Sequence, residues 1–197
     1  MTNLPEIRGE YRLDYNLAHL TWFKAGGNAA VFFKPLDIDD LSHFLSEYPK
    51  ENPVFVLGAG SNTIIRDGGI NGVVVKLGRN FTNMEIIENR LRVGAGCLNY
   101  NLAQFCYNNG IEGFEFLIGV PGTIGGGIAM NAGSYGTEFK DIVDSVIYLD
   151  RLGKKHKIAC KDIGFGYRHN ILHDDLIFVE AIFHFKHGDQ QAIKDKM

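Results

Sequence analysis

The chain has 197 residues, of which 45% are hydrophobic, and a formal net charge of −3. That length suits one domain or two small ones with a sizeable core, and the scattered basic residues give no reason to expect a nucleic-acid partner. No apolar run reaches membrane-spanning length and the N-terminus has no signal-peptide pattern, so we expect a cytoplasmic protein with no membrane partner.

The first part of the chain is predicted to form strands and one helix. Residues 1–20 are polar, with only a weak amphipathic pattern, and we assign no strand there. Asp37 is expected to cap a helix with one apolar face, and Pro49 to end it. The predicted strands are Ala30–Lys34, Val54–Leu57 and Val73–Leu77.

The second part is predicted to contain two hairpins, a helix and one long strand. The first hairpin pairs Met84–Glu88 with Leu91–Val93 around Asn89-Arg90, and the second pairs Val143–Leu149 with Lys155–Ala159. The helix is Leu98–Asn109, with Gly110 as its stop, and the strand is Leu176–Phe185. The pattern indicates a strand-rich α+β fold with a boundary near residue 79, between lobes 1–79 and 80–187.

The stretch from Gly119 to Gly136 has seven of the chain's 24 glycines in 18 residues and no charged side chain. Such a segment suits close approach of the backbone to a flat or phosphate-bearing ligand, although a tight loop packed on its neighbours is the alternative. Pro121-Gly122-Thr123 is predicted to open a short helix, with Ile124 and Ile128 anchoring it beneath. Its free amides would then point at an anion.

A second glycine loop, Gly58-Ala59-Gly60-Ser61-Asn62, follows a predicted strand. Its successive amides favour a phosphate nest, with a plain turn as the alternative. It lacks the third glycine of a dinucleotide fingerprint, because residue 63 is Thr, and no acid follows the next strand. A triphosphate P-loop is excluded because no Gly-Lys-Ser/Thr is present. Two such loops, one in each lobe, favour a dinucleotide held by neutral amides rather than by lysines.

Arg168 lies in a glycine-punctuated loop, has Tyr167 as its neighbour and has no acid within four residues. It is either simply solvated or a fixed cation that binds a carboxylate or stabilises an enolate. His169 and His173 are four residues apart but in a loop, and the three cysteines form no CxxC pair. We therefore expect no metal site and reduced thiols.

Residues 188–197 are predicted to begin a helix capped by Asp189. Ile193 is the main apolar residue of this segment, and we expect it to be unable to hold the helix to a core. The segment is either a frayed, solvated tail or the start of a helix that leads to a further domain, and we favour the second interpretation.

Five motifs, in order, closely resemble the UDP-N-acetylenolpyruvoylglucosamine reductase family. They are FKAGGNA (23–29), LGAGSN (57–62), RDGGINGVVV (66–75), FEFLIGVPGTIGGGIAMNAGSYG (114–136) and FGYRHNIL (165–172). The resemblance implies a two-lobed FAD-binding domain of the vanillyl-alcohol oxidase type, followed by a separate substrate domain. It also implies a cytoplasmic oxidoreductase of peptidoglycan precursor synthesis. Such an enzyme reduces UDP-N-acetylglucosamine enolpyruvate to UDP-N-acetylmuramate with NADPH through FAD.

Carried onto this chain, the resemblance implies that two sets of residues bind FAD. It places Arg168 as the active-site arginine that helps to stabilise the enolate, and Tyr167 on the substrate side. In the family, a serine then protonates the carbanion–enolate and a glutamate assists. The implied FAD-binding residues are Gly58, Ala59, Gly60, Ser61 and Asn62, and Gly122, Thr123, Gly125, Gly126, Gly127, Ile128 and Asn131.

The chain departs from the family pattern because the serine motif and the C-terminal glutamate are absent. We therefore expect a fragment, with the C-terminal substrate domain missing, that folds and binds FAD but does not turn over substrate. The alternatives are another FAD-linked oxidase or dehydrogenase of the same fold, or a non-enzymatic FAD-binding module.

Overall fold

The computed structural model describes residues 4–172 and 175–197. Its first sheet has the order β1-β2-β4-β3, in which β1 is antiparallel to β2 while β2, β4 and β3 run parallel. The strands are β1 (Glu10–Asn16), β2 (Asn28–Lys34), β3 (Val54–Val56) and β4 (Ile70–Val75), and helix α1 (Ile38–Glu47) connects β2 to β3.

The second sheet has the order β11-β10-β12-β6-β5 and is antiparallel throughout. Its strands are β5 (Met84–Ile87), β6 (Arg90–Gly94), β10 (Val143–Leu149), β11 (Lys155–Ala159) and β12 (Ile177–His184). The remaining strands are short pairs: β7 (Ile111–Glu112) with β13 (Lys186–His187), and β8 (Gly133–Ser134) with β9 (Thr137–Glu138).

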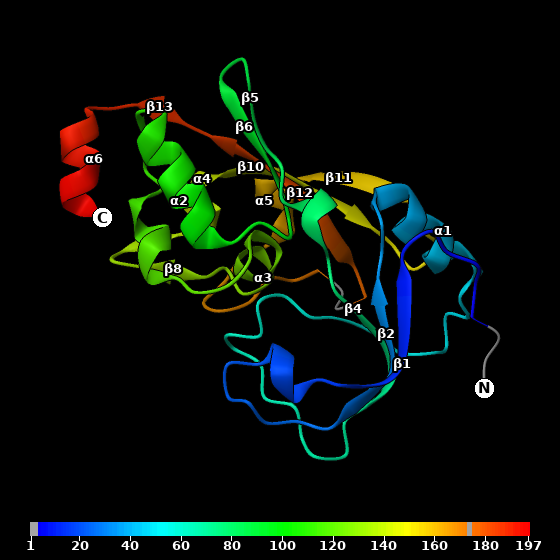
Figure 1. The fold of residues 1–197 in the computed structure, drawn as a ribbon. Coiled ribbons are helices and arrows are strands. Elements are labelled where there is room, and N and C mark those ends of the chain that lie inside the picture. Colours follow the sequence, from blue (N-terminus) through cyan, green and yellow to red (C-terminus); the bar gives the residue numbers. More distant parts are fainter. Residues whose placement is uncertain (1–3, 173–174) are drawn as a thin grey trace.

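The other helices lie with the second sheet. They are α2 (Asn99–Asn108), α3 (Ile124–Ala129), α4 (Phe139–Ile142), α5 (Cys160–Ile163) and α6 (Gln190–Lys196). Short 3-10 turns occur elsewhere along the chain, at Ala18–Leu20, Arg79–Phe81 and Glu115–Gly119. Figure 1 shows α2 and α6 side by side, at the opposite end of the molecule from β1 and β2. Within the described residues, no helix is long and apolar enough to cross a membrane.

Strand β4 of the first sheet is buried on both faces, and its side chains alternate between them. Val73 and Val75 pack with α1 and with residues of β10 and β12, so one core cluster joins the two sheets. Val74, on the opposite face, packs with Phe32 and with Leu57 at the end of β3. The boundary near residue 79 falls between the two sheets in sequence, and it stays a prediction.

Several predicted elements shift in the structure. Residues 10–16, which we left without a strand, form β1, because Tyr11 packs against Phe33 and α1. The fourth strand spans Ile70–Val75 rather than Val73–Leu77. In the first hairpin Ile87 pairs with Arg90, so the turn is at 88–89 instead of 89–90.

The expectation that Ile193 could not attach the last helix is wrong. Ile193 is only 2% exposed and Met197 packs against the main core cluster. Polar contacts add to this attachment, since Gln190 Nε2 donates to the Tyr107 carbonyl (3.2 Å). Asp189 caps the helix as predicted, accepting from the Ala192 amide at 2.9 Å.

Candidate functional site

The loop at residues 58–62 begins where β3 leaves the first sheet. The Leu57 amide still donates to the Val75 carbonyl at 2.9 Å. The chain then turns at Gly60, where φ is 67° and a Cβ would lie 2.1 Å from the Leu20 carbonyl oxygen, so only glycine fits. Among the described residues, no protein acceptor receives a hydrogen bond from any amide of residues 58–62. This loop therefore offers a run of unpaired N–H donors.

The second glycine loop meets the first. Ser61 Oγ donates to the Pro121 carbonyl at 3.2 Å. Helix α3 begins directly afterwards, and its N-cap Thr123 accepts from the Gly126 amide at 3.4 Å through Oγ1. Ile124 and Ile128 are fully buried beneath the helix, as predicted. The two loops thus form one continuous surface built by both sheets.

The expectation that the first amides of α3 point freely at an anion is wrong. The Ile124 amide donates to the Cys97 carbonyl (2.9 Å) and the Gly125 amide to the Ala95 carbonyl (2.8 Å). These bonds form because the connection from β6 to α2 runs beside the start of α3 and pairs Leu98 with Thr123. The longest run of unpaired donors in the described part of the site is therefore at residues 58–62, and not at the start of α3.

The three consecutive glycines of α3 are required for different reasons. A Cβ on Gly127 would lie 2.3 Å from the ring of Phe139, and one on Gly125 would lie 3.2 Å from Ala95. These two glycines allow close packing on the core side. A Cβ on Gly126 would contact only Thr123 Oγ1, at 3.5 Å, and Gly126 lines the cavity described next. Its missing side chain therefore keeps the cavity open.

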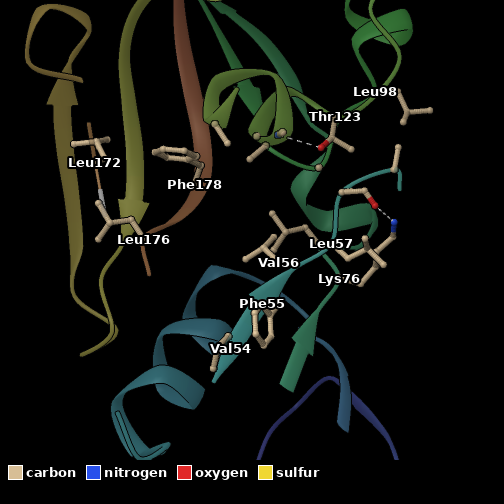
Figure 2. A pocket seen from close by; sticks show the side chains of 18 of the residues that line it. Val54, Phe55, Val56, Leu57, Lys76, Leu98, Thr123, Leu172, Leu176 and Phe178 are labelled. Carbon is tan, nitrogen blue, oxygen red and sulfur yellow. Dashed lines mark hydrogen bonds between the residues drawn. The ribbon is translucent and has the colours of Figure 1, made fainter. Parts of the chain in front are cut away.

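A cavity with two arms lies along both loops. The arms have volumes of about 470 Å³ and 600 Å³, within the range of ligand sites, and they share Val56, Gly58, Ala59, Thr123, Gly126 and Ala129. Figure 2 shows the first arm, with the end of β3 on one side and apolar side chains near β12 on the other. The residues that line this arm and not the other include Phe55, Lys76, Leu77, Leu98, Gly125, Asn170, Leu172, Leu176 and Phe178.

The second arm is lined by both glycine loops and ends at Arg168. Its residues include Gly60, Ser61, Asn62, Gly122, Gly127 and Arg168. Arg168 has a φ of 59°, a conformation that is rare for a residue with a side chain. Its guanidinium carbon is 5.6 Å from the ring centre of Tyr167, which is 82% exposed. The site thus places an accessible cation at one end of a glycine-lined surface.

Three predicted site residues do not line either arm. Ile128 lies in the core beneath α3, and Tyr167 projects into solvent. Asn131 is fully buried, and its side chain bonds to Glu138 Oε2 (3.1 Å), the Gly166 carbonyl (3.0 Å) and the Lys140 amide (3.0 Å). Asn131 therefore fixes the loop that carries Arg168 instead of facing the cavity.

Glu138 is an acid whose carboxylate feels the charge of Arg168. The hydrogen bond from Lys140 (2.6 Å) is the main cause that lowers the pKa of the Glu138 carboxyl. The hydrogen bond from Asn131 and the field of Arg168 add to this effect. Glu138 is thus held in its ionised form close to the arginine.

Lys76 is a cavity residue that the sequence analysis missed. It directly follows β4, and Val75 pairs with Val56 in the parallel neighbour β3, so Lys76 emerges beside the 58–62 loop. Burial lowers the pKa of its ammonium group. In a dinucleotide fingerprint an acid would lie at the end of this strand, whereas here the residue at the strand's end is a lysine. The position could have been found from the rule that adjacent parallel strands end at the same edge of a sheet.

The other titratable residues suggest no metal centre. No group of three or more His, Cys, Asp or Glu residues that could hold a metal occurs among residues 4–172 and 175–197. His173 lies outside the described residues. Cys97 and Cys106 are buried, and burial raises the pKa of the Cys97 thiol to about 11.

Comparison with known proteins identifies the family. Residues 29–159 match the FAD binding domain family. UDP-N-acetylenolpyruvoylglucosamine reductases of Rickettsia typhi and Rickettsia prowazekii are 58% and 56% identical to the whole chain, which spans 67% of the length of each.

Solved structures agree with these sequence matches. The crystal structure of the reductase of the same name from Thermus caldophilus has a TM-score of 0.84 at 29% identity, over 98% of this chain and 67% of that one. A solvent-stable cholesterol oxidase shares the fold alone, with a TM-score of 0.65 at 18% identity over 93% of this chain and 39% of that one. The chain belongs to the FAD-dependent UDP-N-acetylenolpyruvoylglucosamine reductase family.

Proposed function

We propose that this chain holds FAD along the two arms of the cavity, with the pyrophosphate on the amides of residues 58–62. The observation that carries the placement is the run of unpaired amides beside a cavity kept open by Gly126. Successive backbone N–H groups of this kind bind phosphate oxygens without a positively charged side chain. Ser61 Oγ, which already reaches the second loop, lies where both loops contact the same ligand.

The two arms differ in chemistry, and this difference orients the cofactor in the proposal. The first arm is walled by Phe55, Leu176 and Phe178, which suits the flat adenine ring. The second arm ends at Arg168, so the flavin ring belongs there, close to a cation that a reaction can use. The glycine surface between Gly122 and Gly127 lets the ring system approach the backbone.

Enzymes of this family reduce the enolpyruvyl group of UDP-N-acetylglucosamine enolpyruvate to give UDP-N-acetylmuramate, in peptidoglycan precursor synthesis. When bound, FAD carries hydride from NADPH to the enolpyruvyl double bond. In the proposal Arg168 binds the substrate carboxylate and stabilises the negative charge that develops on it during reduction. Asn131 fixes the arginine's loop, and Glu138 balances its charge.

We also propose that the protein acts in the cytoplasm and needs neither nucleic acid nor a membrane as partner. Its cysteines are free in the structure, as in proteins of reducing compartments. The nucleotide-sugar substrate and NADPH are both water-soluble small molecules.

Reconstitution with FAD tests the proposed placement. We expect the 197-residue protein to bind FAD and to shift its flavin absorbance spectrum on binding. Gly126→Val should prevent FAD binding, because the valine side chain fills the space shared by the two arms. Lys157→Val, at an exposed residue on β11, is the control and should bind FAD as the wild type does. Equal FAD affinity of Gly126→Val and wild type would overturn the placement.

A further inference from the structure

Lys76 extends from the end of β4 into the first arm of the cavity. Its Nζ donates to the carbonyl of Gly58, which is the first residue of the loop with unpaired amides. Figure 2 shows this bond next to Leu57, at the edge of the cavity opposite Phe178. The ammonium is therefore adjacent to the loop proposed to bind pyrophosphate.

The charge of Lys76 has no anionic partner in the described part of the chain. An ammonium group has three N–H donors, and among the described residues Lys76 donates only to the Gly58 carbonyl. No carboxylate lies within 4.0 Å of its Nζ among the described residues. A half-buried cation without a counter-ion is costly. Arg92, by contrast, forms two bonds to Glu180 (2.9 and 2.7 Å).

A phosphate would satisfy both features at once. The spare N–H groups of Lys76 lie in the first arm together with Gly58 and Ala59, whose amides are unpaired in the described part of the chain. The rest of the first arm is mostly apolar, so a negative group has no other strong partner there. We propose that Lys76 is a phosphate-binding residue, which holds the Gly58 carbonyl with one N–H group and binds a phosphate of the dinucleotide with the others.

This inference rests on the proposed function, because the phosphate is that of the bound dinucleotide. It goes further in one respect: a charged side chain, as well as neutral amides, sets the preference for a phosphorylated ligand. The sequence had suggested that neutral amides alone hold the cofactor. Salt should therefore weaken binding, since it screens the Lys76–phosphate attraction.

The test is FAD titration of Lys76→Met, Lys76→Arg and the exposed control Lys157→Met at low and high salt. We expect Lys76→Met to bind FAD at least tenfold more weakly at low salt, and less so at high salt. Lys76→Arg should stay within about threefold of wild type, because it keeps the charge, and Lys157→Met should match wild type. Thermal unfolding of each variant without FAD checks that it folds.

Two results would overturn the assignment. Lys76→Met could bind FAD within twofold of wild type, or it could lose the same factor at both salt concentrations, as expected of a purely structural role. If Lys76→Met does not fold, Lys76→Gln answers the same question, because its amide can bond to Gly58 without a charge. Failure of the wild type to bind FAD would instead overturn the proposed function.

Discussion

Asn131 and Gly166 are joined by a hydrogen bond across 35 residues of chain, with Asn131 Nδ2 donating to the Gly166 carbonyl at 3.0 Å. This bond ties the end of α3, the helix of the glycine loop, to the loop that carries Arg168. The same side chain accepts from the Lys140 amide at 3.0 Å. Asn131 has a φ of 39°, which asparagine tolerates better than most residues. The proposed cofactor surface and the loop of the arginine are thus joined by a buried side-chain amide.

Replacing Asn131 with Ala should loosen this connection. The change leaves the Lys140 amide and the Gly166 carbonyl without their side-chain partner, so we expect the free energy of unfolding to fall by about 1–3 kcal/mol. Hydrogen exchange of the amides at 165–170 should become faster. Urea unfolding and exchange by mass spectrometry measure the two effects.

Asn170→Ala is the matched control for Asn131→Ala. Asn170 Nδ2 also reaches α3, at the Ala129 carbonyl (2.9 Å), but the residue is half-exposed to solvent. Water can replace that bond, so a smaller loss of stability is expected. Equal losses for the two variants would show that Asn131 has no special positioning role.

The neighbours Gly126 and Gly127 should respond to substitution in opposite ways. Gly127→Ala places a Cβ 2.3 Å from the Phe139 ring, which Phe116 and Phe183 hold in edge and tilted contacts. We expect it to destabilise the protein by about 1–3 kcal/mol. Gly126→Ala meets only Thr123 Oγ1 at 3.5 Å and should leave the stability unchanged or raise it, because alanine favours helix.

A double variant separates the clash at Gly127 from a general effect of losing glycine. Phe139→Leu removes the ring atoms that the new Cβ meets, so adding it to Gly127→Ala should recover part of the lost stability. Urea midpoints of the two single variants and the double variant measure the coupling. Additive effects would contradict the packing explanation, since they would mean that the Cβ and the ring do not interact.

The sequence predicted the parts of the site that depend on local chemistry. Gly60 needs a positive φ, Thr123 caps a helix, and both requirements are visible in the residue types. The bonds that occupy the amides of Ile124 and Gly125 could not be predicted, because their acceptors lie 27 and 30 residues earlier, in the connection after β6. Glycine counts alone also could not separate Gly126, which faces the cavity, from Gly127, which faces a phenylalanine.

The fold was predictable where one element's own pattern decided it. Helix α1, including its N-cap at Asp37, was predicted because its apolar face and its capping residue indicate the same helix. Strand β1 was missed because its residues are mostly exposed, and it forms through pairing with β2. The attachment of α6 was also missed, since one buried isoleucine is reinforced there by contacts to α2 that come from distant residues.

Trp22 should report directly on FAD binding. It is the single tryptophan of the chain, and its amide donates to the Gly60 carbonyl at 3.0 Å. Flavins absorb where tryptophan emits, so FAD on the 58–62 loop should quench Trp22 fluorescence. The quenching should saturate at the same concentration as the change in flavin absorbance.

Trp22→Phe is the control for this measurement. The side chain is 62% exposed and only its backbone amide bonds to the loop, so the variant should bind FAD within about twofold of wild type. It should give no tryptophan signal. Unchanged Trp22 emission in the presence of saturating FAD would place the cofactor away from this loop.

The stability of the protein should depend on pH through Glu138. The hydrogen bond from Lys140, and further contributions from Asn131 and Arg168, hold the pKa of this carboxyl below its ordinary value. A lowered pKa in the folded state means that the unfolded state binds more protons, so the contribution is complete above the unfolded pKa of about 4.3. It is lost as the pH falls through the folded pKa.

Glu138→Gln removes this titration while it keeps a side chain of similar shape. We expect wild type to be more stable than the variant at pH 7, and the difference to shrink as the pH is lowered from 5 to 3. Urea midpoints across this range measure it, with Glu51→Gln, an exposed glutamate in the turn before β3, as the control. A difference that stays constant with pH would mean that the ionised carboxylate is not what Lys140 and Asn131 stabilise.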